Sequence, residues 1–137
     1  MTPQQIEQVK TSWQKVMPIR EQAVEMFYTR LFALEPSVRT LFRGDMNEQG
    51  RKLMTMITTA VSALDRLETI MPAVQDLGRR HAGYGVRDEH YDTVGAALLK
   101  TLRQGLGAAW VPEVEEAWSA VYGVLAGTMK EAAAVPA

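Results

Sequence analysis

The sequence predicts an all-α protein. Apolar residues recur at intervals of three and four along most of the chain, and no segment shows a sustained alternation of apolar and polar residues. Proline, glycine and capping residues divide this pattern into segments of helical length. Hydrophobic residues make up 47% of the 137 residues, enough for one core. We therefore expect a single domain over residues 1–137, with a fraying tail over residues 132–137.

The first half of the chain predicts two helices and a short third one. Thr2, Pro3 and Gln5 have the form of a capping box, with a hydroxyl cap, a proline at the first helical position and a glutamine three residues after the cap. A second helix is expected from about residue 18 to residue 34, and a short helix from residue 36 to residue 42. The apolar faces of the first two helices comprise Ile6, Val9, Trp13, Val16, Met17 and Val24, Phe27, Tyr28, Leu31, Phe32.

The second half predicts four more helices, after a turn at residues 43–46. Each helix begins at a residue that favours a helix start, and these residues are Asn47, Pro72, Asp88 and Pro112. The helix that begins at Pro72 should end near Gly83 or Gly85. The helix from Asn47 has an apolar face of Leu53, Ile57, Ala60, Val61 and Leu64. The apolar face of the helix from Asp88 comprises Tyr91, Val94, Leu98 and Leu102, and that of the helix from Pro112 comprises Val114, Trp118, Val121, Tyr122 and Leu125.

The composition excludes several functional classes. The chain has no cysteine, which excludes disulfides, thiolate-bound zinc, iron–sulfur clusters and a cysteine nucleophile. Its net charge is −1 and no basic run is longer than Arg79–Arg80, so no nucleic-acid partner is predicted. The uncharged stretches 53–64 and 117–129 are shorter than the ~18 residues of a membrane-spanning helix. The polar start of the chain is unlike a secretory signal, so we expect a cytoplasmic protein without a membrane partner.

His81 is one of two histidines and lies on an apolar helical face. Counting back from His81 in helical steps gives Leu77, then Val74 and Ala73. A neutral imidazole in such surroundings can be an axial ligand of haem iron. The alternative is a core histidine that is hydrogen-bonded to a carbonyl, and this stretch taken alone favours that alternative.

Six short motifs follow one another along the chain in a fixed order. They are Phe27-Tyr28-x-x-Leu31-Phe32, Glu35-Pro36-x-x-x-x-Leu41-Phe42, Gln49-x-Arg51-x-Leu53, His81-x-x-Tyr84-Gly85-Val86, His90-Tyr91-x-x-Val94-Gly95 and Ala117-Trp118-x-x-x-Tyr122-Gly123. Each motif is weak by itself. Together, from Trp13 to about Met129, their order and spacing resemble the globin family, specifically the bacterial single-domain globins and the haem domain of flavohaemoglobins.

The resemblance implies a three-over-three helical sandwich around haem b, with His81 as the proximal iron ligand. It places Tyr28 and Gln49 on the distal side, where both can donate a hydrogen bond to a dioxygen ligand. Phe42 corresponds to an aromatic residue at the haem edge. The other residues expected to line the cofactor pocket are Leu53, Leu77, Val86, Tyr91 and Val94.

The proximal side departs from the flavohaemoglobin pattern. That pattern pairs a glutamate with a tyrosine beside the proximal histidine, and Tyr91 matches the tyrosine. The glutamate position falls on Ala133, whereas Glu131 lies two residues earlier, ~200° around a helix. Glu131 could therefore serve only if the helix end is irregular. His90 is expected to be partly exposed in the first turn of its helix, with no ligand role.

The implied activity is reversible binding of dioxygen, nitric oxide and carbon monoxide. The reaction we expect is oxidation of nitric oxide to nitrate by dioxygen, with Tyr28 and Gln49 as the catalytic residues. We expect no flavin or nicotinamide domain in this chain, so that turnover would need an external reductase. The alternatives are an oxygen carrier or store, a gas sensor, and a helical interaction module without a cofactor.

Overall fold

The computed structural model describes residues 1–42 and 44–134, and the regular structure of these residues is entirely helical. The elements in order are α1 (Pro3–Val16), η1 (Met17–Ile19), α2 (Arg20–Leu34), η2 (Pro36–Leu41), α3 (Met46–Ser62), η3 (Leu64–Thr69), α4 (Met71–Gly83), α5 (Asp88–Leu106), η4 (Gly107–Ala109) and α6 (Pro112–Ala134), where η denotes a 3-10 helix. The predicted all-α class is confirmed.

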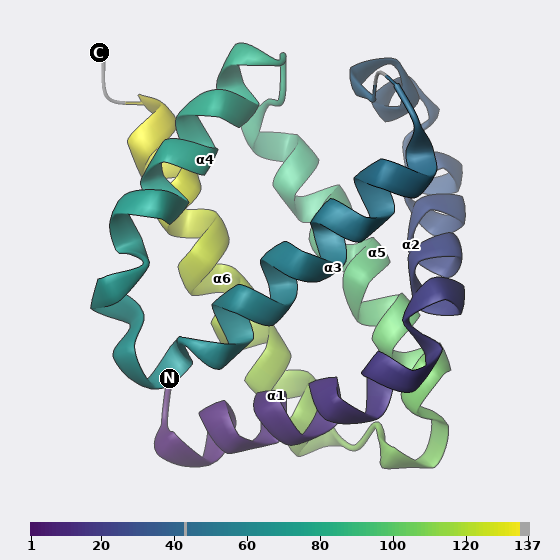
Figure 1. Ribbon diagram of the computed structural model, residues 1–137, viewed down its shortest axis with the longest axis vertical. Helices are drawn as coiled ribbons and strands as arrows, with labels where there is room; N and C mark the ends of the chain where they lie inside the picture. Colours follow the sequence, from purple (N-terminus) through teal and green to yellow (C-terminus); the bar gives the residue numbers. More distant parts are fainter. Residues whose placement is uncertain (43, 135–137) are drawn as a thin grey trace.

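The helices form a sandwich in which the long helices cross one another. In Figure 1, α3 runs diagonally across the front with α5 and α6 behind it, α1 lies across the base and α2 lies along one side. The most extensive contacts join α4 to α6, α2 to α5 and α1 to α6. This arrangement leaves the C-terminal half of α4 and the N-terminal halves of α3 and α5 at the same end of the molecule (Figure 1).

The start of α1 agrees with the start predicted from the sequence, whereas the start of α2 does not. The Thr2 hydroxyl accepts the Gln5 backbone N–H at 3.1 Å, and the Gln5 side chain accepts the Thr2 backbone N–H at 3.0 Å, which confirms the capping box. The second helix begins at Arg20, because Pro18 lies within the 3-10 turn η1.

Two predicted helix caps are wrong by one or two residues. The cap of α3 is Asp45, whose carboxylate accepts the Asn47 backbone N–H at 2.9 Å. The N-cap position of α5 is Arg87, and Asp88 is the first helical residue. In α5 the His90 ring accepts the Arg87 backbone N–H, and this hydrogen bond fixes the start of the helix.

The connection between α2 and α3 also differs in detail from the prediction. The short helix that follows α2 is a 3-10 helix, and Phe42 follows it as an extended residue. Within the predicted turn at residues 43–46, Gly44 has a φ of 94° and Met46 already begins α3. Arg43 lies outside the described residues.

The last third of the chain follows the prediction up to its end. Helix α4 ends at Gly83 as predicted, whereas Leu64 lies in η3 and not in the preceding α-helix. Helix α6 continues to Ala134, and Ala132 is buried, so residues 132–134 are helical where the sequence predicted a fraying tail. Residues 135–137 lie outside the described part of the chain.

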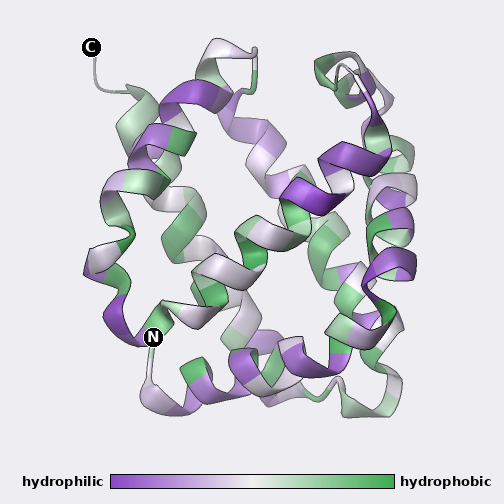
Figure 2. Cartoon of the chain, in the orientation of Figure 1, coloured by the Kyte–Doolittle hydropathy of each residue, from purple (hydrophilic) through white to green (hydrophobic). Residues whose placement is uncertain are grey.

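The core consists of two clusters. The larger cluster is built around Trp13 and Trp118, whose ring centroids lie 5.8 Å apart, and the Trp118 indole donates to the Ser12 hydroxyl at 2.8 Å. The second cluster contains Phe27, Tyr28, Leu31, Val38 and Ala97, with Val24, Phe32, Leu41, Phe42, Met46, Leu53, Val94 and Leu98 packed against it. Figure 2 shows that α3 is hydrophilic in its first turns and carries hydrophobic segments farther along. No helix among the described residues is both long and apolar enough to cross a membrane.

Helices α4 and α6 pack closely against each other at Gly78 of α4. A Cβ atom on Gly78 would lie 2.4 Å from the backbone oxygen of Met129, which is far inside van der Waals contact. Backbone atoms cannot rotate away as a side chain can, so any residue larger than glycine would push α4 away from α6. Gly78 therefore sets the position of α4, the helix that carries His81.

Replacing Gly78 by alanine should separate α4 from α6. We expect Gly78→Ala to lower the free energy of unfolding by about 1–3 kcal/mol, the usual cost of overpacking, measured by urea denaturation. Gly83→Ala is the matched control, because it lies on the same helix and its Cβ would meet no atom within 4 Å. Equal stability of the two variants would contradict the close approach of the helices.

Candidate functional site

His81 lies on the last turns of α4, half-buried, with its ring held by the preceding turn. Its Nδ1 lies 2.9 Å from the backbone oxygen of Leu77. A carbonyl oxygen only accepts hydrogen bonds, so Nδ1 carries the proton and Nε2 keeps its lone pair. Burial lowers the pKa of His81, and the charge of Arg80 lowers it further, although the Leu77 hydrogen bond acts in the opposite direction. The ring is therefore a neutral imidazole whose Nε2 has a lone pair that is able to bind a metal.

The ligand set around His81 suits haem rather than a metal ion held by side chains alone. Among residues 1–42 and 44–134, no group of three or more His, Cys, Asp or Glu residues is placed to hold a metal ion. A single histidine could hold iron firmly only if another group supplied the remaining ligands, as a porphyrin does. The His81 ring is neutral, and the acceptor of its hydrogen bond is the uncharged Leu77 carbonyl. Both features fit axial ligation of haem.

His90 is buried, and the prediction that it is partly exposed is wrong. The residue is 5% exposed and lies in the first turn of α5. Its Nδ1 accepts the Arg87 backbone N–H at 2.8 Å, and its Nε2 lies 3.2 Å from a carboxylate oxygen of Glu35. Both ring nitrogens thus have partners within the protein, an arrangement that supports the assignment of no ligand role.

Tyr28 lies in a cluster of aromatic rings on α2. Its ring centroid lies 5.2 Å from that of Phe27, 5.8 Å from that of Phe32 and 5.4 Å from that of Phe42. None of these side chains has a hydrogen-bond acceptor to offer the Tyr28 hydroxyl. Burial raises the pKa of Tyr28 to about 12, so the hydroxyl stays protonated and can donate a hydrogen bond throughout the physiological range.

Three of the predicted pocket residues lie together around Tyr28. Phe42, Leu53 and Val94 all pack against the cluster that contains Tyr28. Gln49 is half-buried in the first turn of α3, where its backbone N–H bonds to the Asp45 oxygen at 3.1 Å. A Cβ atom on the next residue, Gly50, would lie 2.5 Å from a methyl group of Val24, one turn before Tyr28 on α2. The start of α3 therefore lies directly on the helix that carries Tyr28.

The remaining predicted pocket residues lie around the end of α4. Leu77 is half-buried and supplies the carbonyl for His81, and the Val86 backbone N–H bonds to the His81 oxygen at 3.0 Å. A Cβ on Gly85 would lie 3.5 Å from Leu41 of η2. The turn after α4 thus lies close to the segment that leads to Phe42.

Tyr91 has a cation beside it. Tyr91 is buried on α5, and the Lys130 ammonium lies 5.7 Å from its ring centroid. Helix α6 is α-helical through Ala134 and Glu131 is exposed, so the irregular helix end that Glu131 would need is not formed. The glutamate–tyrosine pair of the flavohaemoglobin pattern is replaced here by a lysine–tyrosine contact.

Sequence reasoning missed three residues that the structure brings together. Glu35, His90 and Thr93 form a hydrogen-bonded group at the joint between α2 and η2. The only signal in the sequence is the glutamate before Pro36, and nothing in the spacing shows that its side chain meets α5.

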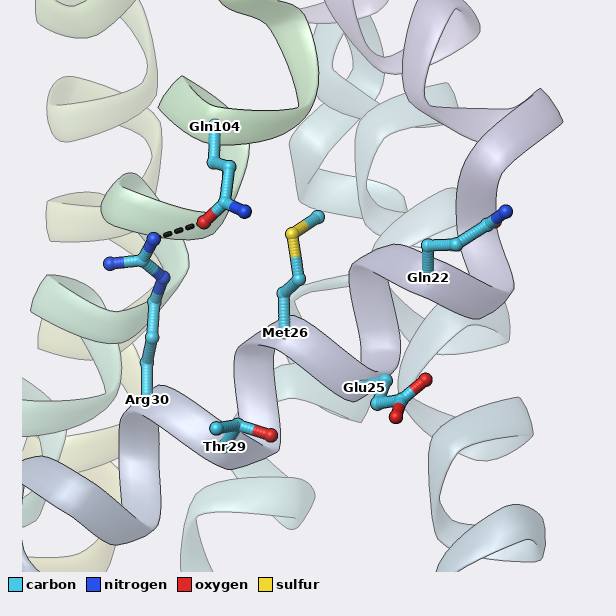
Figure 3. Close-up of a pocket in the computed structure, with 6 residues that line it drawn as sticks. All are labelled: Gln22, Glu25, Met26, Thr29, Arg30 and Gln104. Carbon is cyan, nitrogen blue, oxygen red and sulfur yellow. Dashed lines mark hydrogen bonds between the residues drawn. The ribbon is translucent and has the colours of Figure 1, made fainter.

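A shallow pocket lies elsewhere, between α2 and α5. Figure 3 shows Arg30 donating a hydrogen bond to the Gln104 side chain at this pocket. The residues that line it are Gln22, Glu25, Met26, Thr29, Arg30 and Gln104. None of them is a predicted site residue, so this pocket is separate from the candidate haem site.

A sandwich of crossed helices that carries a neutral histidine on one helix and a buried tyrosine on another is typical of a globin. The Globin family model matches residues 25–129, and the chain belongs to the globin family. A flavohemoprotein of Bacillus anthracis is 34% identical over 114 residues, covering 79% of this chain and 28% of that protein. The chain thus spans less than a third of such relatives. Neuroglobin of Danio rerio is 30% identical over 135 residues, covering 88% of this chain and 85% of that protein.

The fold also matches a solved structure along its whole length. A bacterial globin from Campylobacter jejuni superposes with a TM-score of 0.82 at 27% sequence identity, and the match covers 96% of each chain. The predicted globin fold is therefore confirmed.

The raised pKa of Tyr28 predicts a loss of stability in alkali. A tyrosine whose pKa is higher in the folded than in the unfolded protein stabilises the fold below pH ~10, and this contribution is lost as pH rises toward about 12. The free energy of unfolding should therefore fall over that range, and it should fall less in Tyr28→Phe. The control is Tyr84→Phe, because Tyr84 is 67% exposed. Identical pH dependence in both variants would show that Tyr28 is not buried in solution.

Proposed function

We propose that this globin binds haem b with His81 as the proximal iron ligand and reversibly binds dioxygen. The observation that carries this proposal is the geometry of His81, whose Nδ1 is bonded to the Leu77 oxygen so that Nε2 keeps its lone pair. Haem would supply the iron that binds the gas. Leu77, Val86, Tyr91, Val94, Leu53 and Phe42 would enclose the porphyrin.

Tyr28 and Gln49 would act on the gas ligand from the distal side. A dioxygen ligand on ferrous iron carries partial negative charge and accepts hydrogen bonds, whereas carbon monoxide is a poorer acceptor. The Tyr28 hydroxyl is a protonated donor in apolar surroundings, where a hydrogen bond is electrostatically strong. Gln49 lies on the neighbouring helix, at the point where α3 contacts α2. Both donors would therefore favour dioxygen over carbon monoxide.

The reaction we propose is oxidation of nitric oxide to nitrate. Nitric oxide, dioxygen and one electron together give nitrate, so each turnover needs one electron from a reductase. The role of the chain is to hold dioxygen through Tyr28 and Gln49 until nitric oxide arrives. A cytoplasmic location remains a prediction from the sequence.

One observation favours a second candidate function, an oxygen carrier or store. A carboxylate that accepts the proximal N–H increases the basicity of the histidine, and so the electron density at iron. Here the acceptor is the Leu77 carbonyl, and the charged group beside Tyr91 is the cation of Lys130. This proximal side suits reversible gas binding. The two functions differ in whether an added reductase sustains nitrate formation.

His81 should be indispensable for haem binding. We expect His81→Ala to purify largely without haem, with partial recovery of binding when free imidazole is added. His90→Gln should keep a normal haem content, because glutamine at this position can still accept the N–H of the helix cap. Haem content is measured by absorption spectroscopy. The opposite behaviour of the two variants would overturn the assignment.

Tyr28 should control the release of oxygen. A buried hydrogen bond to a group that carries charge contributes ~1.5–3 kcal/mol, so Tyr28→Phe should release oxygen roughly ten- to a hundredfold faster in stopped-flow measurements. Gln49→Leu should act in the same direction with a smaller effect. Carbon monoxide release should change much less in both variants. Oxygen release at the wild-type rate in Tyr28→Phe would show that Tyr28 is not the distal donor.

A further inference from the structure

Glu35 is the residue that joins α2 to η2. Its backbone N–H donates to the Leu31 oxygen at 3.0 Å and closes α2, and its own backbone oxygen accepts the Val38 N–H at 3.0 Å and opens η2. Helix α2 carries Tyr28, and η2 leads directly to Phe42. The conformation of Glu35 therefore sets the direction of η2 relative to α2.

The Glu35 side chain ties this joint to α5. One carboxylate oxygen accepts the Thr93 hydroxyl at 2.7 Å, and the other lies 3.2 Å from His90 Nε2. Both oxygens thus have a partner on the first two turns of α5. The side chain of Glu35 is only 24% exposed and that of His90 7% exposed, so water competes weakly for these bonds.

The orientation of the His90 ring is fixed by the backbone of α5. A backbone N–H can only donate, so Nδ1 must accept from Arg87 and Nε2 must carry the proton that is donated to Glu35. The hydrogen bonds run in one direction, from the Arg87 backbone through the imidazole to the carboxylate. Thr93 adds a second donor one turn later. Each carboxylate oxygen of Glu35 and each ring nitrogen of His90 therefore has a hydrogen-bond partner.

We propose that Glu35, His90 and Thr93 form a clamp of positioning residues that holds Phe42 against Tyr28 and so aligns the distal hydroxyl toward the gas ligand. The ring centroid of Phe42 lies 5.4 Å from that of Tyr28 and 5.6 Å from that of Phe32, both edge-on. A change in the direction of η2 would move Phe42 out of these contacts and free the Tyr28 ring. The effect on the gas ligand rests on the proposed function, whereas the effect on η2 does not.

The test compares variants of the clamp with a matched surface control. Glu35→Gln leaves one acceptor oxygen for two donors, and His90→Leu removes the link from α5. His90→Gln is the rescue variant, because its amide can accept from Arg87 and donate to Glu35. Glu89→Gln is the control, since Glu89 lies in the same turn of α5 but pairs with Arg87 on the surface.

Three readouts are measured on each haem-loaded variant. In Glu35→Gln and His90→Leu we expect amide hydrogen exchange in residues 37–42 to be roughly three- to tenfold faster, and oxygen release to be faster by a similar factor. The C–O stretching band of the carbon monoxide complex should broaden or shift, because it reports the polarity contributed by Tyr28. His90→Gln and Glu89→Gln should resemble the wild type in all three measurements.

The decisive combination is Glu35→Gln in a Tyr28→Phe background. If the clamp acts through the Tyr28 hydroxyl, the double variant releases oxygen no faster than Tyr28→Phe alone. The positioning role would be overturned if the two substitutions accelerated oxygen release additively. It would also be overturned if Glu35→Gln left the C–O band unchanged while amide exchange in residues 37–42 became faster. Unchanged amide exchange in residues 37–42 would overturn the clamp itself. A Tyr28→Phe variant with normal oxygen release would instead count against the proposed function, and the exchange rates would still decide whether the clamp exists.

Discussion

The hydrogen bond from His81 Nδ1 to the Leu77 oxygen is the interaction on which the candidate site depends. It fixes the tautomer, holds the ring across one turn of α4 and leaves Nε2 with a lone pair, as the proposed iron ligation requires. The bond can orient the ring only if α4 itself is held in place, and the backbone contact between Gly78 and Met129 holds it against α6. A local hydrogen bond and a distant helix–helix contact therefore act together on one imidazole.

The two sides of the site differ in how charge is arranged. Around Tyr28 the neighbouring rings are apolar, since the centroids of Phe32 and Phe42 lie 5.8 Å and 5.4 Å from that of Tyr28, whereas the ionisable pair of Glu35 and His90 lies at the joint between α2 and η2. On the proximal side, the histidine has a neutral acceptor and the nearby Tyr91 ring contacts a lysine. If His81 and Tyr28 take the proposed proximal and distal roles, a neutral ligand and a strong donor would together favour tight retention of dioxygen, which both of the proposed functions require.

Much of the fold could be predicted because it depends on local periodicity and capping chemistry. The face of α4 that carries Leu77 and His81 follows from helical spacing, and the capping box at Thr2 follows from residue type. The errors arose where a side chain from elsewhere completes a local structure. His90 looks exposed in the sequence because it stands among charged residues, yet it is buried by Glu35, which arrives from the end of α2. The contact of Lys130 with Tyr91 likewise depends on how α6 crosses α5, which no local pattern encodes.

The iron–histidine stretching band of the ferrous, ligand-free protein, measured by resonance Raman spectroscopy, tests the central claim most directly. The band reports both the identity of the proximal ligand and the strength of the hydrogen bond that the ligand donates. For the wild-type protein we predict a band at the low frequency typical of a neutral imidazole that is bonded to a backbone carbonyl. In His81→Ala this band should be lost. A band at the high frequency typical of imidazolate, or one that persists in His81→Ala, would contradict the account.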